Sequence, residues 1–296
     1  MYFTFTPGRR IRLSKIKHRI AAGKDFLLSR IVNGFCQEFH GLQHGPSQAW
    51  TTACVGSALA EFRAVALGML EALLSLQWDC GGWSYNQSSI PDADSTLRVL
   101  QFLGKVGFRD RAIINKAERF VIAHQLTDGG IATYLPEAVA LMKYPAGGWT
   151  TSHPCVTALA ARVLQDEQAQ KKASQFISAR LKNGDARAYW WRTPWYVRYE
   201  SGRMNGESIG NDPVEIGLVL LLKARLGLSD YRLTANLIRL QLDDGSFPAS
   251  HQFRIPRPQQ TLDNITGEEE IVEDKARTFS TAAAIVAISR QEALLN

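Results

Sequence analysis

The chain has 296 residues, of which 45% are hydrophobic and 21% charged, so it can bury a full core and shows no compositional sign of disorder. It contains no run of eighteen apolar residues, and its opening residues 1–10 are too short and too polar for a signal peptide, so we expect a cytoplasmic protein. Its four cysteines lie far apart and form no CxxC pair, which argues against a zinc knuckle or a redox motif.

The formal net charge of +6 is concentrated near the N-terminus, on a predicted helix at about residues 10–33. The simplest explanation is a solvated helix face. Attraction to an anionic membrane surface or to a diphosphate group stays open as a functional alternative. Nucleic acid is not expected as a partner, because the basic residues do not interleave with aromatic ones and no nucleic-acid-binding motif occurs. The basic residues are Arg9, Arg10, Arg12, Lys15, Lys17, His18 and Arg19.

Two kinds of helical pattern alternate along the rest of the chain. One is apolar and rich in small residues, as a central layer requires, and each copy begins with a Ser, Thr, Asn or Asp that can cap it. The other is amphipathic and charged, as an outer layer would be. The apolar helices begin near Trp50, Asp94, Thr151, Asn211 and Thr278, and the amphipathic ones are expected near residues 65–77, 110–125, 168–182 and 229–241.

A turn led by glutamine recurs at the ends of the amphipathic helices. Copies begin at Gln77, Gln125 and Gln241, and a degraded copy occupies residues 181–185. Their spacing of about fifty to sixty residues is typical of two-helix repeats, and strand patterns are short. We therefore predict an all-α fold, an αα-toroid (barrel) of about five to six helix pairs in one domain spanning residues 1–296, with the N-terminal helix closing the ring. The glutamines should be structural and tie outer-helix ends to neighbouring turns.

Such a ring has a consequence for function. Its inner helices all run in one direction, so their N-termini share one rim and the preceding loops surround one cavity. The residues expected around that mouth are Trp50, Asp92, Asp94, Trp149, His153, Asp212 and Phe279.

Two carboxyl groups lie at the start of one inner helix, where GGW at residues 81–83 leads into PDADST at residues 91–96. Either aspartate could simply cap the helix. Two neighbouring carboxylates can also hold one proton between them, as protonation of an apolar substrate requires. The helix N-terminus favours the charged form, and Arg98, one turn on, could pair with Asp94 and lower its pKa. The acid interpretation holds if Arg98 points outward to solvent.

These segments resemble the class II terpene cyclases, which include the squalene-hopene and the copalyl-type diterpene cyclases. The Gln-led turns are similar to the family's QW repeats and cover most of the chain weakly. Residues 81–96 resemble, more specifically, its segment in which GGW leads into a PDxDDT acid motif. Residues 190–196, WWRTPWY, look like the WHxSPYY stretch of the diterpene branch.

The resemblance implies a role for each residue of the acid motif. The middle Asp of the family's DxDD protonates a terminal alkene or epoxide, and Asp94 matches it, with Asp92 matching the first position. Ser95 departs from the pattern at the third position: it adds no negative charge and should raise the pKa of Asp94 less than an aspartate, although its hydroxyl can still orient the carboxyl group. Where many members place a histidine that hydrogen-bonds the acid, this chain has Leu159. His153 is a candidate substitute, with packing or capping as the alternative.

Aromatic side chains are expected to line the cavity, because their faces stabilise carbocations without quenching them. Core packing is the alternative for each one. Trp149, Tyr196 and Phe279 rank highest, since they flank predicted inner-helix starts or fall in the family-like stretch. The candidate substrate-binding residues are Trp50, Trp83, Trp149, His153, Trp191, Tyr196 and Phe279.

We therefore predict an isomerase, a class II terpene cyclase that folds a linear prenyl chain, protonates its far end from Asp94 and closes rings through a tertiary cation. Relatives with two or three helical domains are the rule, so one toroid indicates an unusual isoprenoid substrate. A prenylated aromatic compound or a C15 to C20 prenyl diphosphate is favoured over squalene. The chemistry needs no metal ion, and Mg²⁺ would enter only with a diphosphate substrate.

Three alternatives compete with this prediction. The class I route needs a DDxxD motif, whereas Asp243 and Asp244 are followed at once by Gly245 and therefore form a turn. A protein prenyltransferase β-subunit, also a toroid, needs an Asp, Cys and His zinc site that this pattern does not supply. A non-catalytic toroid that binds a lipid or a peptide stays open, because a fold alone does not determine function.

Overall fold

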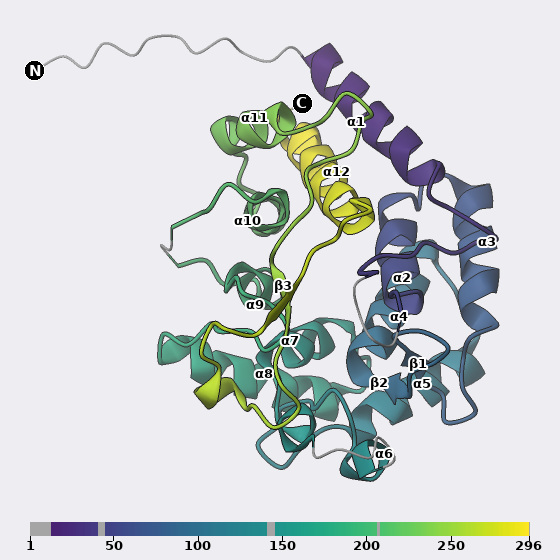
Figure 1. Ribbon diagram of the computed structural model, residues 1–296, viewed down its shortest axis with the longest axis vertical. Coiled ribbons are helices and arrows are strands. Elements are labelled where there is room, and N and C mark those ends of the chain that lie inside the picture. The colour runs from purple at the N-terminus through teal and green to yellow at the C-terminus, as the bar shows by residue number, and fades with distance from the viewer. Residues whose placement is uncertain (1–12, 41–44, 141–145, 206–207, 296) are drawn as a thin grey trace, which may run out of the picture.

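The computed structural model describes residues 13–40, 45–140, 146–205 and 208–295, and these are mostly helical (Figure 1). Among them, six helices form an inner ring in which each packs on the next and the last packs back on the first. The predicted αα-toroid is therefore confirmed. The inner helices are α2 (Ala49–Ala58), α4 (Ala93–Val106), α7 (Pro154–Val163), α9 (Trp195–Ser201), α10 (Pro213–Arg225) and α12 (Thr278–Leu295).

The outer layer consists of amphipathic helices, four of them close to the predicted ranges. They are α1 (Leu13–Leu28), α3 (Arg63–Leu74), α5 (Arg111–Ala123), α8 (Glu167–Lys182) and α11 (Tyr231–Arg239). Helix α1 packs on α12, and its residues Lys15, Lys17 and His18 are exposed. Arg9, Arg10 and Arg12 lie outside the described residues. No helix of the described segments is long and apolar enough to cross a membrane.

Helix α9 is the inner helix that the sequence pattern does not reveal. It has seven residues and lies between α7 and α10, so the five predicted apolar helices become a ring of six.

The expected side-chain caps are present at α4 and α10, where Asp92 and Asp212 accept backbone N–H groups. The N-caps of α2 and α7 make no such bond, and Pro154 at the first turn of α7 instead removes a donor that would need one.

Two of the three Gln-led turns fasten neighbouring outer helices together, as predicted, whereas Gln77 Nε2 donates to Gly81 O of its own turn (2.9 Å). Gln125 Nε2 donates to its own turn at Gly129 O (3.1 Å) and to Ala169 O of α8 (2.9 Å). Gln241 Nε2 does the same to Gly245 O and to Arg19 O of α1, both at 2.8 Å. The turn after α11 therefore holds α1, and this bond joins two ends of the described ring.

The glycine of each turn allows this close approach. A Cβ at Gly245 would lie 2.3 Å from Ala22 O of α1, and the backbone there has φ +83°, which favours glycine. In the degraded copy, a Cβ added at Gly184 would have no other atom within 4 Å. That turn follows α8, and the next helix along the chain, α9, belongs to the inner ring.

Two short hairpins complete the fold. In the first, β1 (Trp83–Ser84) pairs with β2 (Pro91–Asp92), with Trp83 opposite Asp92. In the second, β3 (Phe253–Ile255) pairs with β4 (Glu270–Val272), and Phe253 also bridges to Trp191. This second hairpin lies in the segment between α11 and α12, which runs across the middle of the view in Figure 1. The remaining elements are α6 (Pro136–Ala140) and two single 3₁₀ turns, Gly147–Thr150 and Leu262–Asn264.

Candidate active site

Asp92 is the N-cap of α4. Its Oδ1 accepts the Ser95 backbone N–H at 2.7 Å, which is the capping role that the sequence left open for either aspartate. Thr96 ties α4 to β1, because its Oγ1 donates to Asp92 O (2.7 Å) and accepts the Trp83 N–H (2.9 Å). Cap and hairpin together hold the next carboxyl group, Asp94, in the first turn of α4.

The second oxygen of Asp92, Oδ2, is buried without a hydrogen-bond partner. Burial, with a smaller contribution from the charge of Asp94, raises the pKa of Asp92 to about 7, against the lowering effect of the Ser95 N–H. Ser95 therefore acts on Asp92. We expected its hydroxyl to orient the Asp94 carboxyl group, and the structure gives this serine the other aspartate as its partner.

Asp94 is partly exposed, whereas the residues on either side of it are buried. Burial of its carboxyl group raises its pKa to about 6, opposed by the nearby charge of Arg98 and assisted by that of Glu200. The indole N–H of Trp50 also lowers this pKa and has no partner at ordinary hydrogen-bond geometry. Asp94 thus loses its proton far less readily than a carboxyl group in water.

Two thiols face Asp94 from the neighbouring inner helices. Cys54 of α2 and Cys155 of α7 both interact with its charge, and burial raises the pKa of each thiol to about 12. Both therefore stay protonated and neutral at any physiological pH. They add no charge that would compete with the carboxyl group for its proton.

Arg98 points inward and not outward to solvent, so the support that an outward orientation would give the acid interpretation is missing. Its side chain is 9% exposed, and its guanidinium lies 5.2 Å from the Trp50 ring centre and donates to the hydroxyl of Tyr196. The reason is Glu200 on α9, whose Oε1 lies 3.7 Å from Arg98 Nη1. A buried carboxylate on another helix, rather than water, thus compensates the Arg98 charge, and the pKa of Asp94 stays raised.

Six aromatic side chains gather beside the acid. Trp50 lies 5.0 Å from Phe279 and 6.0 Å from Trp191 between ring centres, and Trp191 stacks on Tyr196 at 4.5 Å. Four of the predicted lining residues are therefore brought together. We call this group the aromatic cluster; it consists of Trp50, Trp191, Tyr196 and Phe279 with Phe39 and Phe253, which the sequence did not indicate.

Trp149 and His153 belong to a second group of rings. Trp149 packs 6.0 Å from Trp190, and His153 stacks on Tyr189 at 3.8 Å. The ring nitrogens of His153 contact Thr133 Oγ1 (2.6 Å) and the acceptor Gly148 O (2.9 Å), and burial lowers its pKa to about 3. His153 is therefore a neutral packing residue, and it does not substitute for the histidine that orients the acid.

Trp83 does not belong to either group. Its side chain is fully buried, and its indole donates to Leu73 O at the end of α3 (2.6 Å). It is therefore not brought together with the rings near Asp94, because the pairing of β1 with β2 directs it into the layer between α3 and α4.

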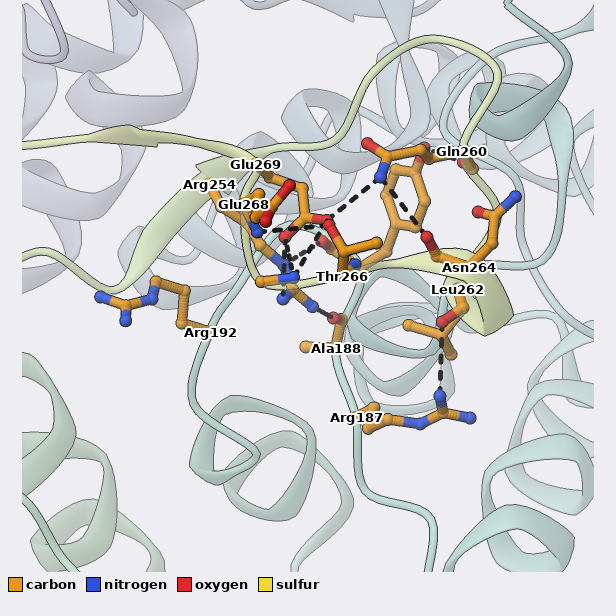
Figure 2. A network of polar contacts seen from close by, with 12 residues as sticks. Arg187, Ala188, Arg192, Arg254, Gln260, Leu262, Asn264, Thr266, Glu268 and Glu269 are labelled. Atoms are coloured by element: carbon orange, nitrogen blue, oxygen red, sulfur yellow. Dashed lines mark hydrogen bonds and ion pairs between the residues drawn. The ribbon is translucent and has the colours of Figure 1, made fainter.

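The second hairpin carries Phe253 and is fastened from its other side. Arg254 Nε donates to Tyr189 O (3.0 Å). Glu269 accepts from Thr266 N (2.7 Å) and Gln260 Nε2 (3.1 Å), as Figure 2 shows. An open pocket of about 420 Å³ lies here, lined in part by Arg187, Arg192 and Arg254. These contacts hold Phe253 against Trp191 in the aromatic cluster.

The residues missed by sequence reasoning share one property. Glu200, Cys54 and Cys155 reach Asp94 from three different helices, and none is near it in the chain. Glu200 alone carried a local signal, as an acidic residue in the otherwise aromatic and basic stretch WYVRYES. No group of three or more His, Cys, Asp or Glu side chains in the described segments is arranged to hold a metal ion.

No family model and no curated protein sequence matches the chain. Solved structures do. The type II terpene cyclase MstE from Scytonema, in an Asp→Ala variant with its product merosterolic acid A, superimposes with a TM-score of 0.83 at 22% identity, covering 95% of this chain and 98% of that one. This chain has the fold of the type II terpene cyclases.

Two further structures agree with this fold. An Asp→Asn variant of MstE in complex with geranylgeranyl dihydroxybenzoate, its substrate, gives a TM-score of 0.80 at 22% identity, covering 95% and 98% of the two chains. A protein from Actinoplanes also gives 0.80, at 24% identity, covering 93% of this chain and 99% of that one. The terpene cyclase fold thus spans nearly the whole of both chains, with the candidate acid at the start of an inner helix.

Proposed function

We propose that the protein is a class II terpene cyclase in which Asp94 is the general acid. The observation that carries the proposal is a partly exposed carboxyl group, with its pKa raised to about 6, directly beside the aromatic cluster. Protonation of an alkene needs a neutral acid that is removed from bulk water, next to a surface that tolerates a carbocation. The similarity to the MstE fold supports this assignment.

The residues divide the reaction between them. Asp94 gives its proton to the terminal alkene, whose π electrons form the new C–H bond and leave a tertiary cation. The aromatic cluster stabilises that cation through the ring faces while internal alkenes attack it and close rings. Loss of a proton from carbon at the end restores a double bond, so the product is an isomer of the substrate. Asp92 holds the start of the helix that carries Asp94.

The substrate that we propose is a prenylated aromatic compound. MstE binds geranylgeranyl dihydroxybenzoate, and this chain shares its fold over nearly the same length. A C15 to C20 prenyl diphosphate is the second candidate. We propose further that no metal ion or other cofactor takes part in the protonation, and that the exposed basic face of α1 draws the cytoplasmic protein to anionic membranes, where prenylated substrates collect.

The test is direct incubation of the purified protein with geranylgeranyl dihydroxybenzoate, farnesyl diphosphate, geranylgeranyl diphosphate and squalene, each with and without EDTA. Products are separated and identified by mass spectrometry. We expect an isomer of unchanged mass that forms in EDTA and disappears in Asp94→Asn.

Asp92→Asn is the matched control, because asparagine also caps a helix and the variant leaves the proton donor in place. Turnover that survives Asp94→Asn would overturn the acid assignment. Absence of product from every substrate, together with tight binding of a lipid or peptide, would favour the non-catalytic toroid.

A further inference from the structure

Glu200 is a fully buried carboxylate between two arginines. Its Oε2 lies 2.7 Å from Arg162 Nη1 of α7, and its Oε1 lies 3.7 Å from Arg98 Nη1 of α4, while its side chain is 0% exposed. A buried carboxyl group without a counter-charge would be strongly destabilising, and the two arginines supply that counter-charge to Glu200. Three inner helices are thereby joined by one charge network, and the charges of Arg98 and Glu200 both act on Asp94.

The charged groups of this network shift the pKa of Asp94, because the other polar groups near it are neutral. The thiols of Cys54 and Cys155 and the hydroxyl of Tyr196 are neutral, because burial raises the pKa of each. The charged or titratable groups around it are therefore Asp92 on β2, Arg98 on α4, Arg162 on α7 and Glu200 on α9. Arg98 stands four residues after Asp94 on the same helix, the spacing at which an acid and a base pair most readily.

Both terminal nitrogens of the Arg98 guanidinium have partners other than Asp94, and the buried Nε has no hydrogen-bond partner. Nη1 donates to Gln101 Oε1 (2.7 Å) and lies on the Glu200 side, and Nη2 donates to the hydroxyl of Tyr196. Among the described residues no ion pair forms between Arg98 and Asp94. The counter-charge that Arg98 would otherwise find in Asp94 is supplied by Glu200.

We propose that Glu200 is a positioning residue that holds Arg98 away from Asp94 and compensates its charge, so that the Asp94 carboxyl group regains and keeps its proton between turnovers. The inference rests on the proposed function for its purpose. Its physical content, the control of one carboxyl group by another two helices away, can be measured without any substrate.

The experiment compares Glu200→Gln with Arg162→Met. Glutamine leaves the Arg98 charge uncompensated, so the pKa of Asp94 should fall by about 1 unit, within the usual effect of one nearby charge. Methionine at position 162 removes the other positive charge and leaves Glu200 less neutralised, so the pKa of Asp94 should rise. Arg162 is 28% exposed beside an open pocket of about 300 Å³, which makes this replacement tolerable for folding.

The pKa of Asp94 is read from carboxyl ¹³C chemical shifts of the full-length protein labelled at aspartate, with Asp94→Asn to assign the resonance. Shifts of opposite sign in the two variants support the proposal, because a merely structural disturbance would not move the pKa in both directions. An unchanged pKa in both, or movement in the same direction, would overturn it.

A third variant covers the case in which Glu200→Gln does not fold with two uncompensated arginines. In Arg98→Met/Glu200→Gln both charges next to Asp94 are gone, and its pKa should lie above that of Glu200→Gln and no lower than in the unaltered protein. A lower value would contradict the proposal.

Where turnover is found, the pH at which kcat falls should move with the pKa in each variant. A protein without turnover that shows the opposite shifts would refute the proposed function and leave the role of Glu200 standing.

Discussion

Cyclisation should slow steeply as the pH rises through 6, because only protonated Asp94 can give a proton to an alkene. Burial, the largest influence on this carboxyl group, raises its pKa to about 6, so kcat is full below that pH and is lost above it. The protonated fraction is about 90% at pH 5, about 10% at pH 7 and about 1% at pH 8. An unperturbed aspartate would be almost wholly ionised by pH 6, and an enzyme depending on it would already be slow there.

The assay is the initial rate at saturating substrate from pH 4.5 to 8.5 at constant ionic strength. A prenylated phenol is the appropriate substrate, since its hydroxyl titrates near 10 and does not change over this range. Asp94→Glu should keep a falling profile at reduced rate, whereas Asp94→Asn should be inactive throughout. A flat profile between pH 5 and 8, or a rate that rises with pH, would refute the reasoning.

Three further predictions concern the aromatic cluster, the bond from Gln241 to α1, and the pH dependence of stability. Phe279→Leu should lower kcat about 30-fold, because a desolvated ring face is worth about 2 kcal/mol to a cation, and should alter the product mixture seen by mass spectrometry. Trp83→Phe, outside the cluster, should leave that mixture unchanged; if it alters the mixture as strongly, the cluster is not the binding surface. Gln241→Leu breaks the bonds to Arg19 O and Gly245 O and should lower the free energy of unfolding in urea by about 1–3 kcal/mol. An unchanged midpoint of urea unfolding would show that other contacts hold α1 to the turn after α11. Burial raises the pKa of Asp274 to about 8, above its unfolded value, so its stabilising contribution is complete below about pH 4 and is lost as the pH rises through 8. The melting temperature should therefore fall between pH 5 and pH 8, less so in Asp274→Asn, and equal pH dependence of the two would refute this assignment.

The periodic parts of the molecule were predictable because they repeat. Each apolar helix begins near a residue that can cap it, and the Gln-led turns recur at the ends of the outer helices. A local pattern that repeats in this way predicts a ring of helix pairs. Helix α9 was not predicted, because its seven residues span too few turns to show a helical period and no outer helix accompanies it.

The site was predictable only in part, because its charges meet across the ring. The position of Asp94 followed from its helix, whereas the sequence left the capping role open between Asp92 and Asp94. The orientation of Arg98 did not follow from the sequence, since its spacing from Asp94 allows either direction and the carboxylate that decides it, Glu200, is about one hundred residues away. Phe39 and Phe253 were missed for the same reason, because a loop and a short hairpin bring them to the cluster without any helical pattern.

The bond from Gln241 to Arg19 spans 222 residues of chain, and it has a consequence for the order of assembly. Contacts between residues so far apart form late, since the long intervening segment must be ordered before they stabilise anything. During synthesis, α1 emerges early and must wait for α11 and α12, so a partly made chain can hold an arc of helices but no enclosed interior. We therefore expect the acid of the nascent protein to remain in contact with water, and ordinary in its proton affinity, until the last part of the chain has been added.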